Sequence, residues 1–412
     1  MFDVDFARSQ FPAFSDPYLD GHAFFENAGG SYACQQTIER LTDYYTKTKV
    51  QPKHPHKPAQ AAIARMEESK ERWAAAMGVA KDEVNFGPST TANTYVLSQA
   101  FGRYLPEGSQ VITTNQDHEA NSGAMRAMAK ERGFGFHEWQ ADPVTGQLSI
   151  DDLLPHVSLK TRLVSFTHCS NIVGNENPVA DWCKAIKAKA PQAVIIIDGV
   201  SHAPHAIPQP WELGCDIYLF SLYKVYSVHQ GMMVVRKDLI EALPNQGHDF
   251  NAGLIGKRLT PAGPDHAQEA SAQGVLDYIE ALDKHHGGDG APNAAVKRVS
   301  ALWAEHEASL KQPLLEFLSA RNDLRLLGSA ELDHRHPTIA VSPAKIEAHA
   351  FATALGELGL GVGSGHFYSA RLVDRMGVGA NTGVTRFSLV HYNTTQEVAR
   401  LIDGMKTILD AA

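Results

Sequence analysis

The chain has 412 residues, of which 43% are hydrophobic and 20% charged, as in a globular protein that buries a large core. Lys and Arg number 37 against 46 Asp and Glu, so the formal net charge of -9 leaves no basic field for a nucleic acid or an anionic membrane. The four cysteines show no CxxC spacing, the N-terminus lacks a signal-peptide pattern, and no apolar run approaches the roughly 20 residues of a membrane span, so we expect a cytoplasmic protein.

The middle of the chain alternates short apolar runs with helical patterns. The runs QVITT at 110, LVSFTH at 163, AVIIID at 193 and IYLFS at 217 each have the length of a buried strand. Such alternation predicts a parallel or mixed sheet covered by helices. The run GMMVVRK, which begins at Gly231, follows IYLFS so closely that we expect it to be an antiparallel return strand.

A Gly- and Pro-rich segment, residues 285–292, separates two helical patterns and is the best candidate for a linker. The chain after it ends in an amphipathic helix that begins with a capping box at Thr394. We expect a large domain at residues 21–285 and a small domain at residues 286–412. Residues 1–20 are expected to form an N-terminal segment that packs with the small domain.

Two side chains that could take part in catalysis follow predicted strands. Asp198 ends AVIIID and Lys224 comes just after IYLFS, so both are expected at the carboxyl edge of the sheet, where such folds bind ligands. Taken singly, Asp198 could be a helix cap and Lys224 a solvated surface residue. The apolar and aromatic neighbours of Lys224 favour burial and a lowered pKa, and imine formation requires a neutral amine.

A third feature is an anion site. Gly87, Ser89 and Thr90 immediately precede an apolar helical run, so hydroxyls and free backbone N–H groups would converge there, although a plain cap is the simpler alternative. Pyridoxal 5'-phosphate (PLP) needs a lysine for its aldehyde, an acid for its pyridine nitrogen and an anion site for its phosphate. We therefore expect Lys224 to carry PLP as a Schiff base.

These residues resemble the class V aminotransferases, and within them the cysteine desulfurase-like branch that lacks the catalytic cysteine, over nearly the whole chain. In that family a strand ending in Asp and a Ser-x-x-Lys segment bind the cofactor, and here they read DGVSHAPH and SLYK. The resemblance implies an α/β, fold-type I PLP-dependent transferase. Its large domain would hold a mixed, mostly parallel seven-stranded sheet sandwiched by helices, beside a smaller α+β C-terminal domain.

The resemblance also implies roles for residues outside these two segments. His118 would stack on the pyridine ring, and Asn171 would hold the phenolic oxygen of PLP. Arg386 would grip the substrate carboxylate with its bidentate fork, and Asn27 would help to enclose it. Lys224, His118 and Asp198 would be catalytic. The implied cofactor-binding set is Ser89, Thr90, His118, Asn171, Asp198, Ser201, Ser221, Tyr223 and Lys224.

One feature of the family is missing. A cysteine desulfurase needs a thiol from a mobile C-terminal segment, but GVGSGHFYSARL places Tyr368 roughly where that cysteine would stand. His366 and Tyr368 are expected to contact the substrate instead. We expect a PLP enzyme that acts on an α-amino acid through an external aldimine and a Cα carbanion, most simply an aminotransferase-type transferase. A lyase without persulfide, an epimerase and an inactive PLP-binding accessory protein remain alternatives.

The expected assembly is a homodimer with active sites near its interface. The segment at Gly263-Pro264 replaces a Gly-Thr pair that commonly reaches the neighbouring subunit's phosphate, and proline cannot donate a hydrogen bond. Either His266 or another group substitutes, or the contact is absent. Lys53 and Lys57 lie in a cationic loop that could select a second negative group on the substrate, although a solvated loop is the simpler interpretation.

A metal-dependent hydrolase is the alternative from a different class of protein. It is suggested by 20 histidines and by the clusters HPH at 54, SHAPH at 201 and HRH at 334. No HExxH or comparable ligand framework is present. We therefore expect no metal site.

Overall fold

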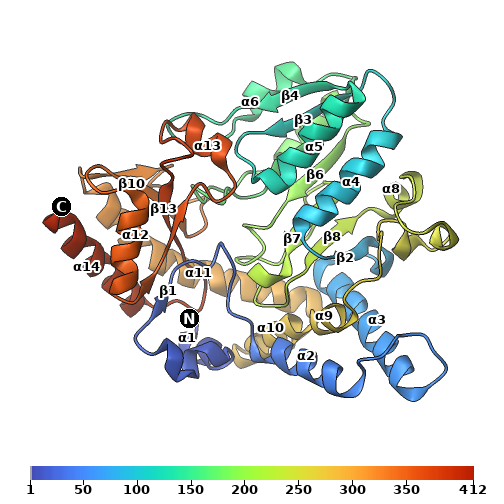
Figure 1. The fold of residues 1–412 in the computed structure, drawn as a ribbon, viewed down its shortest axis with the longest axis horizontal. Helices are drawn as coiled ribbons and strands as arrows, with labels where there is room; N and C mark the ends of the chain where they lie inside the picture. Colours follow the sequence, from blue (N-terminus) through green and yellow to red (C-terminus); the bar gives the residue numbers. More distant parts are fainter. Residues whose placement is uncertain (1) are drawn as a thin grey trace.

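A computed structural model describes residues 2–412. Its centre is a seven-stranded sheet with the order β2-β8-β7-β6-β5-β3-β4, in which β7, β6, β5, β3 and β4 run parallel and β8 runs antiparallel to both of its neighbours (Figure 1). The mixed, mostly parallel sheet and the return strand are thus confirmed. The strands are β2 Val84–Gly87, β3 Gln110–Thr114, β4 Gly135–Trp139, β5 Thr161–Thr167, β6 Val194–Asp198, β7 Ile217–Ser221 and β8 Gly231–Val235.

Helices cover both faces of this sheet, because alternate residues of each buried strand point to opposite sides. In β6, Ile196 packs with the helices that follow β2 and β3, whereas Ile195 and Ile197 pack into the larger core on the other face. The helices of the first 290 residues are α1 Val4–Ser9, α2 Gln35–Lys47, α3 Lys57–Met77, α4 Thr90–Tyr104, α5 Glu119–Arg132, α6 Ile150–Leu153, α7 Val179–Lys189, α8 Lys237–Ala242, α9 His266–Ser271 and α10 Gly274–His285.

The C-terminal part forms a second layered unit, on the left in Figure 1. Its four-stranded antiparallel sheet has the order β12-β13-β10-β9, and the capping box at Thr394 opens its last helix. The strands are β9 Leu324–Leu327, β10 Thr338–Pro343, β11 Leu360–Gly361, β12 Gly363–Gly365 and β13 Val384–Ser388. The helices are α11 Pro292–Ser319, α12 Ala348–Glu357, α13 Ala370–Arg375 and α14 Thr395–Ala411.

Two segments join the large and small units. Helix α11 buries Trp303 in the core beside the large sheet and Leu314 in the core of the C-terminal unit. Strand β1, Ala23–Phe24, pairs in parallel with β11, so this early part of the chain belongs to the C-terminal core rather than to the large sheet. The N-terminal segment packs alongside, where Arg8 pairs with Glu397 of α14.

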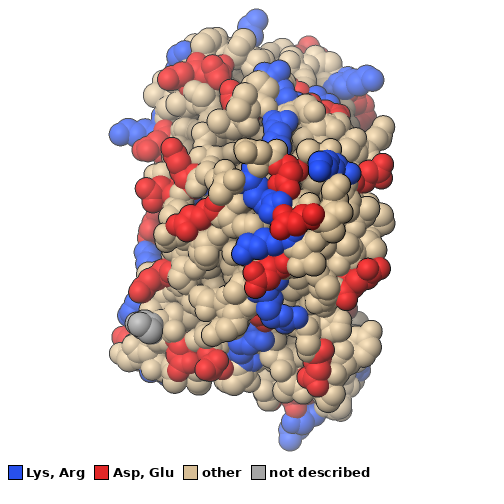
Figure 2. Space-filling view, turned by 90° about the vertical axis from the view of Figure 1, so that its left-hand side faces the viewer, with Lys and Arg blue, Asp and Glu red and all other residues tan. Residues whose placement is uncertain are grey.

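Within residues 2–412, no helix is both long and apolar enough to cross a membrane. On the face shown in Figure 2, acidic and basic side chains lie interspersed.

Candidate active site

The carboxyl ends of β6 and β7 deliver Asp198 and Lys224 to one pocket. Asp198 is the last residue of β6, and Lys224 ends the short 3-10 turn that follows β7. Because β6 and β7 are parallel neighbours, their carboxyl ends meet at the same edge of the sheet. All nine residues of the expected cofactor set line this pocket, which holds about 460 Å³ of space including the part open to solvent.

Lys224 is buried, with 8% of its surface exposed. Burial, followed by the positive charge of Arg386, lowers the pKa of its amine to about 8, against the opposing effects of Asp198 and Glu26. Among the described residues none forms a hydrogen bond with the amine, and the Tyr223 ring lies 5.9 Å from Nζ. The amine is therefore a partly deprotonated nucleophile that faces the pocket without a fixed partner.

Asp198 is a buried carboxylate on the same wall. Burial raises its pKa to about 6, although the N–H of Val200 and the charge of Lys224 oppose the shift. Its Oδ1 accepts the Val200 N–H at 2.9 Å. At neutral pH the group is ionised, so it can hold a cationic ring nitrogen.

The N-terminus of α4 forms the opposite side of the pocket. Ser89 is the N-cap residue, and its hydroxyl accepts the N–H of Ala92 at 3.1 Å. The N–H groups of Thr90 and Thr91 precede the first intrahelical hydrogen bond, which Asn93 donates to the Ser89 carbonyl at 3.0 Å. Donors therefore converge at the positive end of a helix dipole, an arrangement that suits an anion such as a phosphate.

Ser221 extends this anion site from β7. Its hydroxyl lies 2.8 Å from that of Thr90, so the two hydroxyls are held together at the edge of the sheet. Tyr223 stacks on His229 with ring centroids 4.5 Å apart and lies over the same side of the pocket. Ser201 completes the wall from the turn after β6.

His118 is the N-cap residue of α5 and lines the pocket. Its Nδ1 accepts the N–H of Ala120 at 3.0 Å, which leaves the proton of the neutral ring on Nε2. Burial first, and then the charges of Lys224 and Arg386, lower the pKa of His118 to about 3. A neutral, fixed imidazole face is suited to stacking on a pyridine ring.

Asn171 ties the pocket to the loop at residues 366–369. Its Nδ2 donates to the Phe367 carbonyl at 2.9 Å, and its Oδ1 accepts the Ser369 hydroxyl at 2.7 Å. One N–H of the amide therefore remains for a ligand. Phe367 and Tyr368 both adopt positive φ, at 47° and 59°, a conformation that costs free energy for residues other than glycine.

Tyr368 is at the outer end of this loop, 68% exposed, with its ring centroid 5.2 Å from that of His118. It lines the open groove beside the pocket together with Ser89, His118 and Tyr223. His366 accepts the N–H of Tyr368 at 3.1 Å but does not line the pocket. The structure thus brings Tyr368 to the mouth of the pocket, whereas His366 lines neither the pocket nor the groove beside it.

Arg386 lies beneath the loop, with 2% of its surface exposed. Its guanidinium stacks on the Phe367 ring at 3.6 Å and donates to the Asn171 carbonyl at 3.1 Å. It also pairs with Glu26, a residue that the sequence interpretation missed. Glu26 directly precedes Asn27 in FENAGG, and this adjacency to an expected site residue was the only signal in the sequence.

Asn27 differs from the expectation. Its amide is buried, donates to the Ser388 carbonyl at 2.8 Å and accepts the hydroxyl of Tyr392. The side chain therefore fixes the N-terminal segment on β13, and it would have to exchange a partner to touch a substrate. It lines a small cavity on the far side of Lys224.

Two other segments lie away from the pocket. Gly263-Pro264 lines a separate, largely apolar cavity with Phe86 and Val96, which holds about 920 Å³ of space including the part open to solvent. The cationic loop with Lys53 lies in the connection between α2 and α3 and does not line the pocket of this chain.

The donor set fits PLP. The pocket offers an amine without a partner at Lys224, a carboxylate at Asp198 for the pyridine nitrogen and hydroxyls with free N–H groups at Ser89 and Thr90 for the phosphate. All three kinds of group line one cavity.

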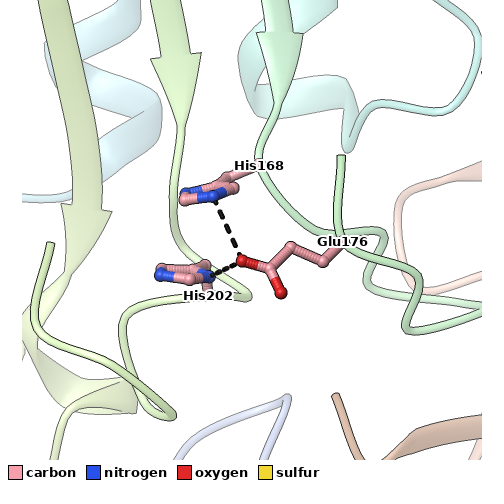
Figure 3. Close-up of side chains that lie close together, drawn as sticks. All are labelled: His168, Glu176 and His202. Carbon is pink, nitrogen blue, oxygen red and sulfur yellow. Dashed lines mark ion pairs between the residues drawn. The ribbon is translucent and has the colours of Figure 1, made fainter. Parts of the chain in front are cut away.

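A second group of titratable side chains lies near the carboxyl end of β5, where His168 N donates to the Asp198 carbonyl. Figure 3 shows Glu176 pointing between His168 and His202, with N···O distances of 3.5 and 3.4 Å. His202 Nδ1 lies 3.0 Å from His336 Nε2, so the histidines of two sequence clusters, SHAPH and HRH, do meet.

The ring geometry of this group favours packing and hydrogen bonding over a shared ion. The His168 and His202 rings are stacked, with centroids 3.7 Å apart and planes 16° from parallel. Metal bonds of about 2.0–2.1 Å in the ring planes would hold the two centroids farther apart. Burial holds the pKa of His202 and of His336 well below the ordinary value, so these rings are neutral.

The four cysteine thiols lie outside the pocket lining. Each side chain is buried, and none of them lines the pocket or the groove at its mouth. Burial also raises the pKa of the Cys183 thiol to about 12, which disfavours the thiolate that a nucleophile requires.

Comparison with known proteins places the chain in a family and agrees with the fold. A family model described as Aminotransferase class-V matches residues 23–251 and 296–401. The aminotransferase-like protein FGM3 of Gibberella zeae is 30% identical over 417 residues, which cover 99% of each chain. A cysteine desulfurase of Pectobacterium carotovorum is 28% identical over 419 residues, which cover 99% of this chain and 98% of that one.

A solved structure has the same fold. The apo cysteine desulfurase of Thermococcus onnurineus NA1 matches with a TM-score of 0.86 and 19% identity, covering 100% of this chain and 99% of that chain. The likeness confirms the expected fold-type I architecture.

Proposed function

The chain belongs to the aminotransferase class-V family, whose members are PLP enzymes, and from this premise we propose that it transfers the amino group of an α-amino acid. The observation that carries the proposal is the lining of the pocket. It contains a buried, unpartnered lysine and no thiol, and Arg386 lies next to it, where its guanidinium donates to the carbonyl of the lining residue Asn171. A persulfide-forming reaction needs such a thiol, whereas amino-group transfer does not.

The residues that would hold the cofactor divide by the group they recognise. Ser89, Thr90 and Ser221 would bind the phosphate, and Asp198 would keep the ring nitrogen protonated. Lys224 would bind the aldehyde covalently. When bound, PLP supplies an electron sink for cleavage of a bond at the Cα of an amino acid.

The chain's own groups then act on the amino acid. Arg386 would orient it through its carboxylate, and His118 and Tyr368 would cover the site and exclude water. Lys224 would move a proton at its Nζ, because its pKa of about 8 lets the amine both accept and donate near neutral pH.

The experiment is a panel of L-amino acids added to the PLP-loaded protein, one at a time and without a keto acid. Amino-group transfer converts the cofactor stoichiometrically into its amine form and releases one 2-keto acid per site. Sulfide from L-cysteine would identify a desulfurase, and ammonia with a keto acid but unchanged cofactor would identify a lyase. Loss of optical activity alone would identify an epimerase.

We also propose that the chain forms a homodimer. Phe250 and Leu254 are 84% and 52% exposed on the segment before the Gly263-Pro264 cavity, and such apolar side chains are typical of buried interfaces. A mass of twice 44.9 kDa by light scattering would support the dimer, and a mass of 44.9 kDa would contradict it.

A further inference from the structure

Glu26 forms an ion pair with the guanidinium of Arg386, which the proposed function assigns to the carboxylate of the substrate. Arg386 is buried, and its ion pair with Glu26 joins residues 360 positions apart. The backbone of Glu26 forms a β-bridge with Ser388, two residues after Arg386 on β13, so the pairing is fixed by the fold. Arg386 Nε is buried without a hydrogen-bond partner among the described residues. A bidentate carboxylate would need the side of the guanidinium that Glu26 now covers.

Two glycines make room for the Glu26 side chain. A Cβ on Gly29 would lie 1.9 Å from Glu26 Oε2, and one on Gly363 would lie 3.0 Å from Glu26 Oε1. No side chain could stand at Gly29 while Glu26 keeps its position. The neighbouring Gly30 differs, because a Cβ there would meet only ordinary contacts, the first at 3.5 Å from Tyr223.

From this geometry we infer that Glu26 is an internal competitor that holds Arg386 until the carboxylate of an amino-acid substrate displaces it. A buried guanidinium without a counter-ion is costly, so a built-in carboxylate stabilises the empty site. A substrate carboxylate must replace that partner, and only the difference between the two pairings contributes to its binding. Glu26 therefore sets the affinity for carboxylates and favours ligands that can match its pairing. The inference rests on the assignment of Arg386 in the proposed function.

The test measures binding of propionate, a monocarboxylate without an amine, to the PLP-loaded protein by calorimetry. Glu26→Gln removes the competing charge. Gly29→Ala keeps the charge, but the added methyl group displaces the Glu26 carboxylate from Arg386. Both variants should bind propionate about tenfold more tightly than the wild type. Gly30→Ala is the matched control for the backbone and should bind like the wild type.

A second control separates the ion pair from net charge. Glu119 pairs with Arg126 at the mouth of the pocket and is 50% exposed, so Glu119→Gln removes one negative charge near the same site without freeing Arg386. Its propionate affinity should be unchanged. Equal tightening in Glu119→Gln and Glu26→Gln would overturn the inference, as would unchanged or weaker binding in both Glu26→Gln and Gly29→Ala.

The experiments distinguish a failure of the inference about Glu26 from a failure of the proposed amino-group transfer. Propionate cannot undergo amino-group transfer, so its affinity reports on Glu26 even if no amino acid converts the cofactor. With a reactive amino acid, Glu26→Gln should lower KM more than it changes kcat, because Glu26 acts on binding and not on proton transfer. A large loss of kcat at unchanged KM would assign Glu26 to catalysis and contradict its role as a competitor.

Discussion

Gly231 of β8 lies directly against the backbone of Thr90, so that a Cβ on this glycine would stand 2.4 Å from the Thr90 nitrogen. Real Cβ atoms do not approach backbone atoms so closely. The glycine therefore allows the N-terminus of α4, with its free N–H groups, to sit beside the edge of the sheet. The relationship makes the anion site depend on a residue without a side chain.

Gly231→Ala should damage the anion site and the fold together. The added methyl group must push the start of α4 away, so we expect a loss of roughly 2–3 kcal/mol in the free energy of unfolding. PLP affinity should fall by at least tenfold because the phosphate donors move. Urea denaturation and fluorescence titration with PLP measure the two effects. Gly253→Ala is the control, since nothing lies within 4 Å of a Cβ there; equal effects in both variants would contradict the prediction.

Asp198→Asn should stabilise the cofactor-free protein while it impairs cofactor function. The pKa of Asp198 is raised from 3.8 to about 6, so the folded protein keeps a proton that the unfolded chain loses between these values. Stability therefore falls as the pH rises through this window, and an uncharged amide should recover roughly 1–3 kcal/mol at pH 7. Denaturation of the cofactor-free proteins at pH 4 and pH 7 tests this, with a difference only at pH 7 expected.

The rate of PLP attachment should follow the ionisation of Lys224. Burial lowers the pKa of this amine to about 8, and only the neutral amine attacks an aldehyde. The rate should rise tenfold per pH unit below pH 8 and level off above it. Stopped-flow absorption with cofactor-free protein gives the profile, and borohydride reduction followed by mass spectrometry locates the attachment. An inflection near 10.5, or attachment in Lys224→Ala, would contradict the assignment.

The sequence predicted the parts of the site that local rules control. Asp198 and Lys224 each follow an apolar run, and parallel strands bring such residues to one edge. The anion site could be predicted because Ser89 precedes a helical pattern. Strand β4 was missed because its first residues are exposed and lack the apolar run of a buried strand.

Other parts of the site depend on contacts between distant residues. Glu26 and Arg386 carry no shared pattern, and only the pairing of the N-terminal segment with β13 brings them together. The positive φ angles of Phe367 and Tyr368 could not be predicted either, because neither residue favours them. Tertiary hydrogen bonds to Asn171 hold that loop.

Ser369→Ala should loosen this loop without unfolding the protein. It removes the hydroxyl that Asn171 Oδ1 accepts at 2.7 Å and leaves a buried acceptor unsatisfied, which costs about 1–3 kcal/mol locally. Hydrogen exchange of residues 366–369 should quicken while the exchange of β6 does not. Ser309→Ala, on an exposed turn of α11, is the control and should leave both rates unchanged.

The cluster of His168, Glu176, His202 and His336 should stabilise the contact between the large and small units and should not bind a metal ion. Stacked rings cannot both direct their lone pairs at one ion, so protein purified without a tag should hold well below one equivalent of zinc after equilibrium dialysis. His336→Ala should then lower the free energy of unfolding by roughly 1–3 kcal/mol and leave the PLP spectrum unchanged.

The difference in free energy of unfolding between the wild type and His336→Ala should depend on pH in a definite direction. Burial depresses the pKa of His202 and of His336 below 6.5, so the unfolded chain takes up protons that the folded protein does not, and wild-type stability falls as the pH drops below 6.5. His336→Ala removes one of these groups, so its stability should fall less steeply between pH 6.5 and pH 5. Urea unfolding at both pH values measures the slope. One equivalent of tightly bound zinc in the wild type, absent from His336→Ala, would show instead that the rings reorient around an ion.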